Sequence, residues 1–209
     1  MKKINLIILT FLILVPMKLH ALIEVDITRG NLNPLPIAVS ALYSDNETIE
    51  ALKKEINVDE IGNEISLVIE SNLKATGLFN PLEKKAFLQK PDVAHLKPRF
   101  EDWSLIKAQA LITGKVEFKD DRVRVEFRLW DVLAGREMLA LAFTTVPNNW
   151  RRIGHIISDK IYERLTGEKG YFDTRIIYVS EEGPKTARVK KLAIMDQDGF
   201  NTKYLTLGN

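Results

Sequence analysis

Apolar and polar residues alternate most regularly between residues 105 and 147. Three strand-like runs lie here, separated by short polar breaks at residues 119–121 and 134–136. The second run alternates apolar residues at odd positions with charged residues at even positions between 122 and 129. Because successive side chains of a strand point to opposite faces, this pattern predicts an antiparallel meander with one apolar and one wet face.

Two longer segments carry apolar residues at spacings of three and four, the period of a helix. They are residues 61–76 and 149–166, and each has an apolar stripe that can cover the apolar face of the sheet. The expected ends are Gly77 for the first helix, and Asn148 or Asn149 and Gly167 for the second.

Further β-prone runs occur at residues 35–42, 175–180 and 189–196, and a turn at Asp198-Gly199 leads into a last short run at 203–207. The predicted fold is therefore α+β, with a mixed β-sheet covered on one face by two helices. The antiparallel strands after residue 174 have no helix to pack on, which predicts an incomplete unit at the C-terminal end.

The N-terminus has the layout of a secretory signal peptide. Lys2 and Lys3 precede an apolar run at residues 4–15, which is shorter than the 18 or more residues that span a bilayer. Ala21 supplies the small residue at the expected cleavage point, so the mature chain is expected outside the cytoplasm.

Removal of this leader changes the charge balance. The chain has 30 basic and 28 acidic residues, and loss of the three leader lysines would leave 27 against 28. A mature chain without excess positive charge is not expected to bind nucleic acid. The chain also has no cysteine, which excludes disulfides, thiolate metal sites and thiol nucleophiles.

The sequence contains few residues suited to catalysis. His20, His95 and His155 are far apart, and His155 is expected to be a solvated or capping histidine. Residues 196–199 resemble the start of a calcium loop, but Leu207 stands where the twelfth-position glutamate is needed, which favours a hairpin turn. We therefore expect no catalytic residue, no cofactor and no metal site.

The segment directly after the expected cleavage point has the alternation of a strand. Its apolar residues alternate with polar ones, so it can pair with the domain's own sheet or recruit a partner strand, and the sequence leaves both open. The candidate binding residues are Leu22, Ile23, Glu24, Val25, Asp26, Ile27 and Thr28.

The run GHIISDKIYERLTGEKGYFDTRIIYVSEEG at residues 154–183 resembles the junction between the two domains of the TolB family, the periplasmic components of Tol-Pal systems. Supporting runs lie at residues 73–82, 103–118, 148–167 and 191–206. The resemblance implies a signal peptide (1–21), a partner-binding strand (22–33), an α/β domain (34–168), a linker (169–174) and a truncated first blade of a β-propeller (175–209).

The resemblance also implies a function and a location. Members of this family act in the periplasm as adaptors without catalytic activity, linking inner- and outer-membrane components for outer-membrane invagination at division, envelope integrity and protein transport. Their N-terminal strand engages the C-terminal domain of TolA, which here corresponds to residues 22–28. Pal and colicins bind the propeller, so Pal and other outer-membrane partners are expected for a full-length member, and the propeller residues that bind them have no counterpart in this sequence.

Two other hypotheses remain at this stage. The chain could be a periplasmic ligand-binding or hydrolytic α+β domain whose site the sequence does not reveal. It could also be a truncated product without a stable function, since its last strands have no sheet to complete.

Overall fold

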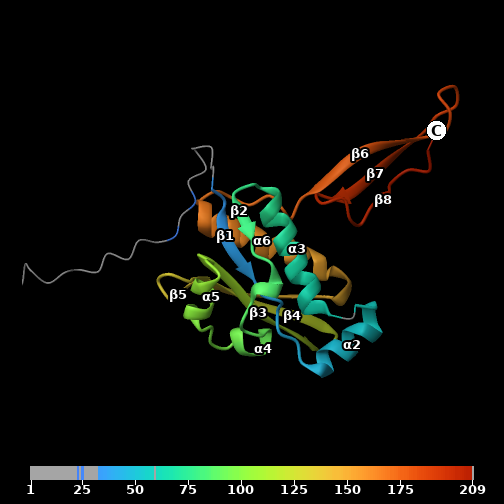
Figure 1. Cartoon of the computed structure of the whole chain (residues 1–209). Coiled ribbons are helices and arrows are strands. Elements are labelled where there is room, and N and C mark those ends of the chain that lie inside the picture. Colours follow the sequence, from blue (N-terminus) through green and yellow to red (C-terminus); the bar gives the residue numbers. More distant parts are fainter. Residues whose placement is uncertain (1–22, 24, 26–32, 59, 209) are drawn as a thin grey trace, which may run out of the picture.

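The computed structural model describes residues 23, 25, 33–58 and 60–208. Its larger part is built on a five-stranded mixed sheet in the order β2-β1-β3-β4-β5 (Figure 1). β1 runs parallel to β2 and β3, and β3, β4 and β5 form the expected antiparallel meander, which is confirmed. The strands are β1 Leu35–Val39, β2 Phe79–Pro81, β3 Ala110–Lys119, β4 Arg122–Asp131 and β5 Arg136–Thr145.

The two expected helices pack against each other and on one face of this sheet. They are α3 (Ile61–Ala75) and α6 (Trp150–Thr166), and their apolar stripes form the main core together with β1, β3 and β4. Gly167 ends α6 with a φ of 76°, a conformation that glycine adopts without strain. Asn149 occupies the N-cap position of α6, as expected, although its side chain makes no capping hydrogen bond.

The helix that follows β1 was not predicted from the sequence. α2 (Asn46–Ile56) occupies the polar stretch between β1 and α3. Asp45 caps it, because its side chain accepts a hydrogen bond of 2.8 Å from the backbone N–H of Thr48.

The opposite face of the sheet, which was predicted to be wet, carries the exposed or half-buried charged residues of β4 but is covered in part. The short elements η1 (Lys84–Ala86), α4 (Pro91–Ala94) and α5 (Phe100–Leu105) lie between β2 and β3 in the chain. α4 and α5 contribute to a second, smaller core centred on Trp103, which is 1% exposed. The indole N–H of Trp103 donates to Gln89 Oε1 at 2.8 Å, which satisfies this polar group inside the cluster.

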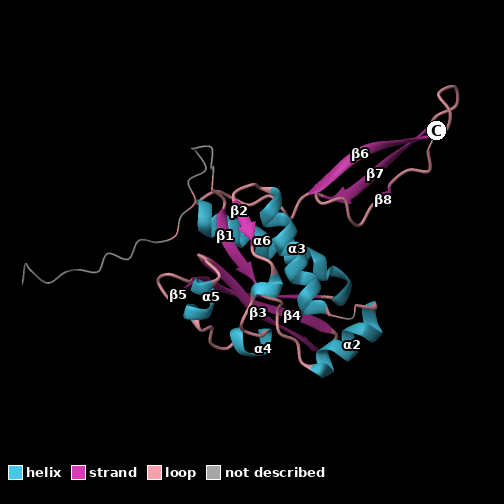
Figure 2. Ribbon diagram, in the orientation of Figure 1, coloured by secondary structure: helices cyan, strands magenta, loops and turns pink. Residues whose placement is uncertain are grey.

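The remaining strands form a separate antiparallel sheet in the order β6-β7-β8, as predicted. They are β6 (Arg175–Glu182), β7 (Val189–Asp196) and β8 (Lys203–Tyr204), and this sheet projects away from the first one (Figure 2). Ile177 and Val179 of β6 are 62% and 58% exposed. In the part of the chain that the structure describes, no helix has both the length and the apolar character needed to cross a membrane.

Candidate functional site

Val25 lies at the C-terminal end of α6. Its backbone N–H donates a hydrogen bond of 2.7 Å to the carbonyl oxygen of Leu165. The last four carbonyls of a helix have no partner within the helix, so the Leu165 oxygen is free to accept this bond. The Val25 side chain is 4% exposed and belongs to the main core.

Ile23 lies over the gap between β5 and α6. It is half-buried and lines an apolar cavity of about 620 Å³ together with Leu139 and Leu141 of β5 and Arg164 of α6. Arg164 fixes this wall of the cavity, because its Nε donates at 3.1 Å to the carbonyl oxygen of Met138, the bulged residue of β5.

The structure describes two residues of the predicted partner-binding segment 22–28. Ile23 and Val25 are docked on the chain's own domain, and neither belongs to a strand. The other residues predicted for this role, and the expected cleavage point, lie outside the described residues: Ala21, Leu22, Glu24, Asp26, Ile27 and Thr28.

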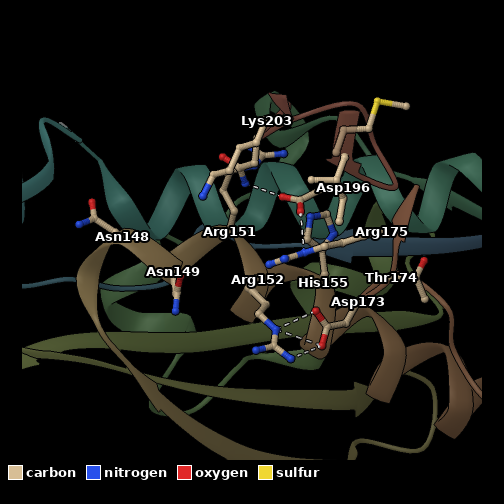
Figure 3. A pocket seen from close by; sticks show the side chains of 13 residues that line it. Asn148, Asn149, Arg151, Arg152, His155, Asp173, Thr174, Arg175, Asp196 and Lys203 are labelled. Atoms are coloured by element: carbon tan, nitrogen blue, oxygen red, sulfur yellow. Dashed lines mark hydrogen bonds and ion pairs between the residues drawn. The ribbon is translucent and has the colours of Figure 1, made fainter. Parts of the chain in front are cut away.

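A second cluster of polar residues lies where the first part of the chain meets the smaller sheet (Figure 3). Arg151 on α6 forms an ion pair of 2.5 Å with Asp198, in the turn after β7. Arg152 donates two hydrogen bonds to the carboxylate of Asp173, from Nε at 2.9 Å and from Nη2 at 3.0 Å. A polar cavity of about 490 Å³ lies between these pairs. These contacts fasten the turn after β7 and the segment before β6 to the beginning of α6.

His155 lies at the centre of this cluster and is 2% exposed, so the prediction of a solvated or capping histidine is wrong. Its Nδ1 lies 3.0 Å from Nδ2 of Asn72 on α3. Burial lowers the pKa of His155 below its ordinary value, and the nearby Asp198 carboxylate opposes this effect. The ring is therefore neutral at pH 7.

The chemistry of this cluster is ion pairing. His155, Asp196 and Asp198 bring three possible metal ligands within 4.8 Å of one another. However, Asp198 already accepts from Arg151, and Asp196 accepts from the side-chain amide of Asn201 at 2.5 Å. The carboxylates are therefore committed to neighbouring cations and amides rather than arranged to activate a nucleophile.

The sequence did not identify three polar residues of this cluster: Asn72, Ser158 and Gln197. Two of them could have been found, because they interrupt an apolar helix stripe. Asn72 lies within the apolar stripe of α3, and Ser158 lies within that of α6. A polar residue on a buried helix face needs a partner, and each of these two finds the other across the helix interface at 2.9 Å.

Comparisons with known proteins agree with this fold. The model of the TolB amino-terminal domain family matches residues 23–138. The Tol-Pal system protein TolB of Pelagibacter ubique (strain HTCC1062) is 76% identical over 197 residues, which are 94% of this chain and 44% of that protein. The crystal structure of TolB from Acinetobacter baumannii matches with a TM-score of 0.65 at 25% identity, covering 83% of this chain and 39% of that one. The chain thus spans less than half the length of these relatives.

Proposed function

This chain belongs to the TolB amino-terminal domain family, and from this we propose that it serves as a non-enzymatic adaptor of a Tol-Pal system in the periplasm. In this role it links inner- and outer-membrane components for outer-membrane invagination at division, envelope integrity and protein transport. The proposal is supported by the 76% identity to a Tol-Pal system protein and by the signal-like N-terminus. Because this chain spans 44% of that relative, we assign it no contact with Pal.

The partner that we propose is the C-terminal domain of TolA, and the binding element is the segment 22–28. Its apolar residues alternate with Glu24 and Asp26, a pattern that suits addition of a strand to a partner's sheet. The single observation that carries the proposal is the docking of Ile23 and Val25. Val25 lies in the main core and Ile23 lines an apolar cavity, so two side chains of this segment pack against apolar surface.

Docking on the domain and binding to a partner exclude each other at Val25. A buried valine contributes about 1.5–3 kcal/mol, and one backbone hydrogen bond adds about 0.5–1.5 kcal/mol. Ordering each backbone residue costs about 1–2 kcal/mol, so the docked state is only weakly favoured. A partner of moderate affinity can therefore displace the segment.

A peptide of residues 22–33 is expected to bind the TolA C-terminal domain, and Val25→Asp in this peptide should weaken binding on the order of a hundred-fold or more. A carboxylate in an apolar pocket loses its hydration without gaining a partner, which costs roughly 1–3 kcal/mol or more. Isothermal titration calorimetry measures both affinities. Glu24→Gln is the matched control and should change affinity less than three-fold or so, because its side chain lies on the other face of the strand. Undiminished binding of the Val25→Asp peptide would rule out this strand.

The complete chain is expected to bind the same partner more weakly than the free peptide, because only the undocked fraction can bind. Leu141→Ala removes apolar surface from the cavity that Ile23 lines, without altering the segment, and it should raise the affinity of the chain about two- to five-fold. Leu67→Ala is the control, since Leu67 is similarly exposed, at 43% against 37%, but lies on α3. Equal affinities of peptide, chain and variant would show that docking does not compete with the partner.

A further inference from the structure

Five polar groups join α3, α6 and the turn after β7 in one network of hydrogen bonds. Nδ2 of Asn72 lies 3.0 Å from Nδ1 of His155 and donates to Oγ of Ser158 at 2.9 Å. The Ser158 hydroxyl in turn donates to the carbonyl oxygen of Gly154 at 2.8 Å. Nε2 of Gln197, in the turn after β7, donates to Oδ1 of Asn72 at 2.9 Å. Asn72 is the hub, because each side of its amide holds a different element.

The partners in this network fix the position of the imidazole proton. The single hydroxyl hydrogen of Ser158 is used on Gly154, so the Ser158 oxygen must accept from Asn72. The amide nitrogen of Asn72 therefore faces His155, and Nδ1 of the ring accepts from it. In a neutral imidazole the proton then resides on Nε2.

A second proton on His155 is incompatible with this arrangement. It would place an N–H donor on Nδ1 opposite the N–H donors of Asn72, 3.0 Å away. Asn72 can relieve this clash by rotating its amide so that Oδ1 faces the ring. That rotation withdraws the acceptor from Gln197 and the donor from Ser158, so the bond that anchors the turn is lost.

We propose that His155 is a protonation switch at this junction. Neutral His155 locks the turn after β7 onto α3 through Asn72 and Gln197, and protonated His155 releases this contact. The ion pair between Arg151 and Asp198 persists, so the smaller sheet loosens on the larger part of the chain rather than separating from it.

The charges around His155 set the pH range of the switch. Burial is the strongest influence and lowers the pKa below the ordinary value of 6.5, while Arg151 acts in the same direction and Asp198, 3.6 Å from Nε2, acts against it. An unfolded chain takes up the proton at a higher pH than the folded one. The contact is therefore complete above about pH 6.5 and is lost as the pH falls through the lowered pKa of His155 in the folded chain. The charged groups that face the site are Arg151, Arg152, Asp173, Arg175, Asp196, Asp198 and Lys203.

Hydrogen exchange of the complete chain between pH 8 and pH 5 tests the switch. Protection factors, which remove the intrinsic pH dependence of exchange, should fall about ten-fold at residues 196–199 with a midpoint below pH 6.5, while protection in β3 and β4 stays constant. Proteolysis within residues 168–174 should accelerate over the same range. Constant protection at the turn from pH 8 to pH 5 would overturn the proposal.

Variants separate His155 from other titrating groups. His155→Gln should abolish the pH-dependent loss of protection. Asn72→Asp supplies a carboxylate that accepts from a protonated ring and still accepts from Gln197, so the turn should stay protected at pH 5. His95→Gln and Glu70→Gln are controls that should respond like the unaltered chain. Glu70 is chosen because burial raises its pKa, which makes it another candidate for the titrating group. A pH response that survives Asn72→Asp, or that disappears in Glu70→Gln, would overturn the assignment to His155.

Discussion

Phe127→Ala is expected to lower the free energy of unfolding by about 3–5 kcal/mol. Phe127 is fully buried near the middle of β4, where both helices and Val25 join the same core. Its ring also stacks on Phe143 of β5, with 6.3 Å between ring centres. Removing the ring leaves a cavity that a sheet strand paired on both sides cannot close. Chemical denaturation followed by circular dichroism measures the loss.

Phe143→Ala is the matched control for this prediction. It removes the same ring from the same stacked pair, but Phe143 lies on the edge strand and is half-buried. We expect a cost of roughly 1–2 kcal/mol, because less apolar surface returns to water. Equal losses in the two variants would contradict the position of the core centre on β4.

The regular elements of the larger part could be predicted because their signals are local. The alternation in β4 and the apolar stripes of α3 and α6 report burial on one face, whatever covers that face. α2 was missed because Asp45 and Asn46 resemble a polar loop, although Asp45 acts as its cap. The short helices around Trp103 were missed because a single turn carries too little periodicity to be recognised.

The candidate site depended on contacts between distant residues, which periodicity does not report. His155 has charged neighbours in the sequence, and these favoured a solvated histidine. Its burial comes from Asn72, 83 positions away, and from the turn at Asp198. Val25 shows the opposite case. Its alternation indicated a side chain that packs on apolar surface, and the fold shows that the chain's own core provides such a surface.

Gly62→Ala is expected to destabilise the chain by about 3 kcal/mol or more, although alanine is the better helix former by about 1 kcal/mol. A Cβ at this position would lie 1.8 Å from the carbonyl oxygen of Leu42, which belongs to the backbone. The two residues are also joined by a hydrogen bond of 3.1 Å from Leu42 N–H to the Gly62 carbonyl. The clash therefore cannot be relieved unless α3 moves away from the segment that follows β1.

Gly154→Ala distinguishes a backbone clash from simple crowding at the same helix pair. Its Cβ would meet a methyl carbon of Val68 at 2.9 Å, and a side chain can shift where a carbonyl cannot. We expect a loss of roughly 1–2 kcal/mol for this variant, and denaturation midpoints measured side by side give the comparison.

If Gly62→Ala proved as stable as the unaltered chain, its helix propensity would outweigh the contact, and α3 would have to lie further from Leu42. Because α3 carries Asn72, such a shift would also displace the group that faces His155, so the same variant tests the geometry on which the switch depends.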